Sequence, residues 1–214
     1  MGENMHYYTI EGHNLAEDTI KKSRFIINCY HVENQYEVEK YLKNIYKEHY
    51  KATHNTFAYI LGEEKNIQKY SDDGEPSGTA GKPILEAINQ RELSNVLVVV
   101  TRYFGGIKLG GGGLIRAYNG SACLGLKSAS FIRMQYSALI EISFEYTYLG
   151  KIKAFLDKEY KLKDTIIYDD KVHVKIFIPA EESENLIRNL VELTNDNIHV
   201  SIISEEYIKL SYKE

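Results

Sequence analysis

Hydrophobic residues recur at helical spacing in one early segment and form continuous runs on either side of it. In residues 34–50, apolar side chains three or four positions apart are separated by charged residues, which predicts an amphipathic surface helix. The β-branched and aromatic residues of 23–31 and 53–61 predict the flanking strands. The uninterrupted run 95–103 (NVLVVVTRY) predicts a further strand that is buried on both faces.

Two loops rich in small and polar residues lie around that buried strand. Residues 69–83 (KYSDDGEPSGTAGKP) are dense in Gly, Ser, Asp and Pro, which predicts a loop, and 84–91 predict a short helix. Residues 105–113 (GGIKLGGGG) predict a second loop, followed by an Ala- and Leu-rich helix over 114–129. A glycine-rich loop therefore joins a buried strand to a helix.

The remaining pattern predicts a second domain. Strands are expected at 139–146, 163–168, 172–178 and 198–210, and helices at 149–160 and 182–193. This β-α-β-β-α-β order is the ferredoxin-like arrangement. A boundary near Ser137 then gives an N-terminal domain over 1–137 and a C-terminal domain over 138–214. The fold class expected for the whole chain is α+β with two domains.

Composition and charge narrow the class of protein. The chain has 214 residues, of which 43% are hydrophobic and 26% charged, as in a soluble globular protein. No apolar run approaches the roughly 20 residues that cross a bilayer, and the N-terminus lacks a secretory pattern. A cytoplasmic protein without a membrane partner is expected. The two cysteines, Cys29 and Cys123, form no disulfide framework.

The charge differs between the two predicted domains. Residues 1–137 carry 16 basic and 15 acidic residues, a net +1, whereas 138–214 carry 10 and 15, a net −5. The total of −4 excludes a uniformly basic nucleic-acid binder. It does not exclude a local basic surface, and residues 82–116 carry a net +3.

The loop at 69–83 is a candidate metal site. Asp72, Asp73 and Glu75 offer three carboxylates within four positions, and His54 precedes them in a predicted strand. Oxygen ligands of this kind bind hard divalent cations. The alternative interpretation is a polar turn in which the Asp side chains accept from nearby backbone amides. A divalent metal is the one cofactor that the residues suggest.

The glycine-rich loop is a candidate anion or nucleic-acid site. Glycines let the backbone approach a ligand closely, and amides at a helix N-terminus attract anions. The candidate residues are Lys82, Arg102, Gly105, Gly106, Lys108, Gly110, Gly111, Gly112, Gly113 and Arg116. Neither the Walker nor the Rossmann pattern is present, and the alternative is that these glycines only fit a tight turn. The sequence shows no complete catalytic apparatus, so the catalytic residues stay unknown.

Two long motifs resemble those of a known family. The segments 71–85 (SDDGEPSGTAGKPIL) and 98–118 (VVVTRYFGGIKLGGGGLIRAY) closely resemble the signature of the YigZ/IMPACT family. SRFI at 23–26 and ATHNTFAY at 52–59 support the match. The resemblance implies an N-terminal domain like the second domain of ribosomal protein S-five. It also implies a ferredoxin-like C-terminal domain similar to the fifth domain of elongation factor G.

Three functions are compatible with this resemblance. The first is a non-enzymatic regulator of translation that binds RNA or the ribosome through the basic glycine-rich loop, since eukaryotic members of the family regulate translation. The second is a metal-dependent Xaa-Pro dipeptidase, because some bacterial members carry that label. The third is a protein-interaction module in stress regulation, with the acidic C-terminal domain as its docking surface.

Overall fold

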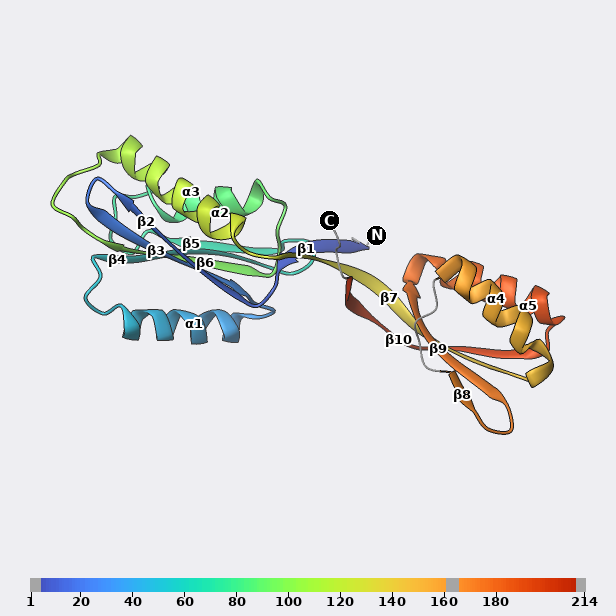
Figure 1. Cartoon of the computed structure of the whole chain (residues 1–214). Helices are drawn as coiled ribbons and strands as arrows, with labels where there is room; N and C mark the ends of the chain where they lie inside the picture. Colours follow the sequence, from blue (N-terminus) through green and yellow to red (C-terminus); the bar gives the residue numbers. More distant parts are fainter. Residues whose placement is uncertain (1–4, 161–165, 211–214) are drawn as a thin grey trace. The chain divides into compact units, whose positions relative to one another are not determined.

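The chain folds into two units (Figure 1). The computed structural model describes residues 5–160 and 166–210. One unit comprises Tyr7–Arg133, and the other comprises Met134–Leu210 with Met5 and His6. The predicted boundary near Ser137 falls inside a long strand, β7 (Phe131–Phe144), that runs through this division. Helices and antiparallel sheets occur in both units, which confirms the predicted α+β class.

The N-terminal unit is built on a five-stranded antiparallel sheet. Its strands are β2 (His13–Ile20), β3 (Ser23–His31), β4 (His54–Leu61), β5 (Ile67–Ser71) and β6 (Val96–Tyr103). They lie in the order β2-β3-β6-β4-β5. The three predicted strands of this region are confirmed as β3, β4 and β6. The edge strands β2 and β5 were not predicted, because they carry few apolar residues and β5 is almost wholly exposed.

Helices cover both faces of this sheet (Figure 1). Helix α1 (Gln35–Glu48) lies on one face, and α2 (Gly81–Asn89) and α3 (Gly111–Lys127) lie on the other. The side chains of β6 alternate between two separate cores, one shared with α2 and α3 and one shared with α1. This double burial explains why β6 is a continuous apolar run in the sequence.

The predicted loops are shorter in the structure than in the sequence analysis. Residues 69–71 belong to β5 and 81–83 to α2, so the first loop is confined to residues 72–80. Helix α3 begins at Gly111, so three of the clustered glycines form its first turn. A polar segment can still pair with the edge of a sheet, as residues 69–71 do with β4. A glycine-rich segment can likewise form the first turn of a helix, as residues 111–113 do in α3.

The C-terminal unit has the predicted β-α-β-β-α-β order. Its elements are β7, α4 (Leu149–Tyr160), β8 (Ile166–Tyr168), β9 (Val172–Pro179), α5 (Ser183–Thr194) and β10 (Ile198–Leu210). Strand β10 pairs with β7, β7 with β9 and β9 with β8, the strand neighbourhood of a ferredoxin-like sheet. The predicted strand residues 163–165 lie outside the described residues.

Two further features complete the fold. A short strand, β1 (His6–Ile10), was not predicted and pairs with β7. Among the residues that the structure describes, no helix combines the length and the apolar character needed to cross a membrane. The predicted site residues all belong to the N-terminal unit.

Candidate functional site

Asp72 fixes the loop between β5 and α2. Its carboxylate accepts three backbone N–H groups: Oδ2 from Gly78 at 2.8 Å, and Oδ1 from Ala80 at 3.0 Å and Gly81 at 2.8 Å. Gly78 lies in the loop, Ala80 is the N-cap of α2 and Gly81 is the first residue of the helix. Asp72 therefore fixes the loop backbone and also accepts from one of the amides that a helix leaves open at its first turn.

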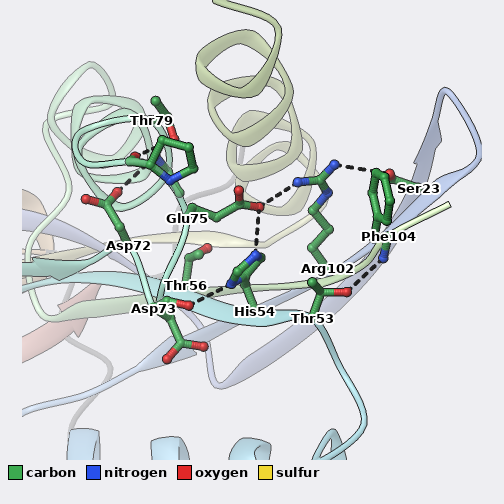
Figure 2. Close-up of polar contacts among 12 residues, drawn as sticks. Ser23, Thr53, His54, Thr56, Asp72, Asp73, Glu75, Thr79, Arg102 and Phe104 are labelled. Atoms are coloured by element: carbon green, nitrogen blue, oxygen red, sulfur yellow. Dashed lines mark hydrogen bonds and ion pairs between the residues drawn. The ribbon is translucent and has the colours of Figure 1, made fainter. Parts of the chain in front are cut away.

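Asp73 joins the same loop to β4 and α1, and Figure 2 shows its contact with His54 of β4. Asp73 Oδ2 accepts the N–H of Asn55 at 2.6 Å, and Oδ1 accepts the hydroxyl of Tyr46 at 3.1 Å. His54 Nδ1 donates to the carbonyl oxygen of Asp73 at 2.7 Å, because a carbonyl only accepts. Burial, with the nearby Asp73 carboxylate, raises the pKa of Tyr46 to about 12.

Glu75 is the centre of a buried polar cluster. Its Oε1 accepts from Arg102 Nη1 at 2.7 Å and from the hydroxyl of Tyr118 at 2.6 Å, and His54 Nε2 lies 3.7 Å away. Only 8% of Glu75 and 5% of Arg102 are exposed, and Tyr118 is fully buried. Arg102 Nη2 also donates to Ser23 Oγ at 3.3 Å. Burial, reinforced by the Glu75 carboxylate, raises the pKa of Tyr118.

The four predicted metal ligands are thus engaged with protein groups. The structure brings His54, Asp73 and Glu75 close together, but the carboxylates of Asp72, Asp73 and Glu75 accept from amides, hydroxyls or a guanidinium. A cation beside Glu75 would also face the Arg102 charge. This donor set does not fit a metal centre and favours the alternative of a polar turn.

One group in the described residues has the ligand spacing of a metal site, and it lies elsewhere. Asp169, Asp170 and His173 gather at the turn between β8 and β9 in the C-terminal unit. Their side chains are exposed or half-buried, and His173 Nε2 is 3.1 Å from Asp169 Oδ1. The predicted loop residues do not contribute to it.

The glycine segment, residues 104–113, runs from the end of β6 through the first three residues of α3. Gly106 and Gly110 have φ angles of +85° and +73°, which side chains disfavour. Gly105 lies against the turn between β2 and β3, where a Cβ on Gly105 would be only 1.9 Å from the carbonyl oxygen of Lys22. Its N–H also donates to Ser23 Oγ at 3.3 Å. The path of the segment therefore depends on glycine.

At the N-terminal turn of α3, no acidic side chain repels an anion and no capping side chain occupies the backbone amides. Gly110 is the N-cap, so no side chain caps the helix, and no acidic residue lies in the first turn. Gly111 and Gly112 are exposed, and a Cβ on Gly112 would lie 3.7 Å from Arg116 Nη1. The Arg116 guanidinium is therefore beside the first-turn amides, and both attract anions.

The predicted cations divide into two groups. Lys82, Lys108 and Arg116 are exposed, and no ion pair within residues 5–160 and 166–210 involves them. Arg102 is instead buried against Glu75. Asn119, three residues after Arg116 on α3, donates to the carbonyl of Pro83 at 3.1 Å, so α3 contacts the first turn of α2, to which Lys82 belongs.

The structure adds three residues that were not predicted for the site. Ser23 and Tyr118 complete the contacts of Arg102 and Glu75, and Phe104 covers the Arg102 guanidinium, with the ring centroid 5.5 Å from Cζ. The sequence gives one sign that this cluster is buried: Arg102 continues a run of buried strand residues. Ser23, Phe104 and Tyr118 lie within the motifs that resemble those of the family, but neither their charge nor their spacing singles them out.

Comparisons with known proteins agree with this architecture. Residues 21–126 match the Impact N-terminal domain, and residues 142–197 match a domain of unknown function, DUF1949. A solved structure titled as the crystal structure of an hypothetical protein aligns with a TM-score of 0.62 at 29% identity. The alignment covers 94% of this chain and 99% of that one.

Similar sequences occur in bacteria and eukaryotes. The chain is 42% identical over 189 residues to IMPACT family member YvyE of Bacillus subtilis (strain 168), covering 88% of this chain and 87% of the relative. It is 31% identical over 191 residues to IMPACT family member YigZ of Escherichia coli (strain K12), covering 88% and 93%. Protein IMPACT of Danio rerio is 41% identical over 97 residues, which are 43% of this chain and 30% of that protein. The chain therefore belongs to the IMPACT family.

Proposed function

We propose that this protein is a non-catalytic cytoplasmic regulator of translation that binds RNA, free or in the ribosome, through the glycine segment. The observation that carries the proposal is the combination of an open α3 N-terminus with the exposed cations Lys82, Lys108 and Arg116. Phosphate groups match both features, since they accept from backbone amides and pair with Lys and Arg. Family membership supports a role in translation.

The burial of Arg102 changes the predicted interface. Arg102 is paired with Glu75 and has 5% of its surface exposed, so its role is to hold the loop of residues 72–80, the acidic loop, and the glycine segment together. Phosphate contacts then rest on Lys82, Lys108 and Arg116. Because such contacts release counterions, the affinity for RNA falls steeply as salt increases.

The test is RNA binding by the full chain across a salt series. Alanine at Lys82, Lys108 and Arg116 together removes three charges, which lowers the slope of log K against log salt by about 2 for single strands. The matched control is alanine at Lys151, Lys153 and Arg188, three exposed cations of the C-terminal unit. Both variants have a formal charge of −7, three below the −4 of the native chain.

The expected result is weaker, less salt-dependent binding to transfer RNA and ribosomes in the first variant and unchanged binding in the control. Equal losses in both variants would show that net charge alone governs binding. Affinity of the native chain that does not change with salt would overturn the proposal.

A further inference from the structure

Phe104 is an exposed aromatic residue at the start of the glycine segment. It follows directly on β6, and 45% of its surface is exposed. Its backbone N–H donates to Thr53 Oγ1 at 3.0 Å, and the next residue, Gly105, is packed against the Lys22 carbonyl. The ring is therefore presented to solvent from a fixed backbone position.

The covered side of the Phe104 ring rests on a cation that is itself fixed. Figure 2 shows Glu75, Arg102 and Phe104 in one row, with the guanidinium in the middle. The Arg102 Cζ is 5.5 Å from the centroid of Phe104 and 5.6 Å from that of Phe25. Arg102 Nε is buried without a hydrogen-bond partner in the described structure. The rings and the ion pair to Glu75 together hold the guanidinium in place.

This arrangement has the properties of a stacking platform. The Phe104 ring is partly exposed, the Arg102 guanidinium lies over one of its faces, and hydrogen bonds hold both the backbone at Phe104 and the guanidinium. Exposed Lys108 follows four residues later, on the same glycine segment. Aromatic rings beside a basic backbone-binding segment are the features by which proteins bind single-stranded nucleic acids.

We propose that Phe104 stacks on an unpaired base of RNA whose phosphates are bound by the glycine segment. This inference rests on the proposed function and narrows its ligand to single-stranded RNA. In a duplex the bases are stacked on one another, so only the phosphates of a duplex reach this surface. The protein should therefore bind single strands more tightly than blunt duplexes of the same length.

The first experiment separates stacking from phosphate binding. Phe104→Leu keeps an apolar side chain over Arg102 and removes the aromatic face. We expect its affinity for an oligouridylate of about ten nucleotides to fall about tenfold, a typical loss for one stacked base. Its affinity for a blunt RNA duplex of equal length is expected to stay unchanged. Phe131→Leu is the control, since Phe131 is 44% exposed in the same unit.

A second variant gives a direct signal. The native chain has no tryptophan, so Phe104→Trp introduces a single reporter at the platform. Stacking of a base on the indole is expected to quench its fluorescence with the oligouridylate and to leave it unchanged with the duplex. This variant also keeps an aromatic ring, so its affinity for the single strand is expected to remain at or above the native value.

The outcomes distinguish the two proposals. If the native chain binds neither these two RNAs nor transfer RNA and ribosomes, both proposals fail. If it binds both RNAs with salt dependence but Phe104→Leu leaves the single-strand affinity unchanged, stacking is overturned and the phosphate interface stands. Equal losses of affinity for single strand and duplex in Phe104→Leu would also overturn stacking, because they would point to distortion of the glycine segment.

Discussion

The acidic loop, residues 72–80, and the glycine segment both connect to Arg102 but use their polar groups differently. Every carboxylate of the acidic loop accepts from a protein donor, and Glu75 is almost fully buried. The glycine segment leaves its helix-end amides and Lys108 open to solvent. The carboxylates of the acidic loop are therefore engaged within the protein, whereas the amides and the lysine of the glycine segment are exposed.

The largest effect that distinguishes the two loops is expected at the buried ion pair. Glu75→Gln removes the charge opposite Arg102, and leaving a buried cation unpaired lowers the free energy of unfolding by about 3–5 kcal/mol. Urea unfolding measures this loss. The double variant Glu75→Gln with Arg102→Met should regain part of it, because the unpaired cation is gone. A loss below about 1 kcal/mol in the single variant would contradict the structural role assigned to this pair.

A smaller effect is expected at Asp72. Asp72→Ala removes the acceptor for the Gly78 amide in the loop and for the amides of Ala80 and Gly81 at the start of α2, and losing a helix cap lowers stability by about 1–2 kcal/mol. Asp157→Ala, an exposed Asp of α4, is the control and should change little. Thermal unfolding with and without Mn²⁺ checks the interpretation. If Mn²⁺ raised the Tm of the native chain but not of Asp72→Ala, the carboxylate would be a metal ligand instead of a cap.

The smallest effect is expected in the glycine segment and its neighbours. Alanine at Lys82, Lys108 and Arg116 alters exposed side chains, so each substitution should change the free energy of unfolding by no more than about 0.5 kcal/mol. The same denaturation measurement applies. If these substitutions lowered the free energy of unfolding as much as Glu75→Gln, the two loops would not differ in their contribution to stability. Weaker RNA binding by the variant could then result from unfolding and would not identify the binding surface.

The main elements of the fold were predictable because their residues have strong periodicity. β3, α4 and β10 have the predicted bounds, and β6 begins one residue later than predicted. The strands that were not predicted, β1, β2 and β5, are short or lie at a sheet edge, where one side needs no apolar partner. Strands β2 and β5 contain no fully buried residue, so they produce no apolar pattern. Strand β1 buries Tyr7, Thr9 and Ile10, but five residues are too few for a clear period.

The site was less predictable than the fold. The residue types of Glu75, in a loop, and Arg102, near the end of β6, suggested a metal ligand and a phosphate contact, because charged residues are mostly exposed. Their pairing across 27 positions depends on how the acidic loop folds back over the end of β6. No spacing rule along the chain encodes that approach, so the sequence alone left both interpretations open.

The contacts around Glu75 also bear on how the unit forms during synthesis. They join Ser23, His54, Glu75, Arg102 and Tyr118, which belong to or adjoin β3, β4, the acidic loop, β6 and α3. In a chain emerging from the ribosome, the Glu75 carboxylate and the Arg102 guanidinium are synthesised before Tyr118, whose hydroxyl completes their buried cluster. Domains fold as units during translation. The glycine segment can therefore take its final path only when α3 has emerged, near the end of the N-terminal unit.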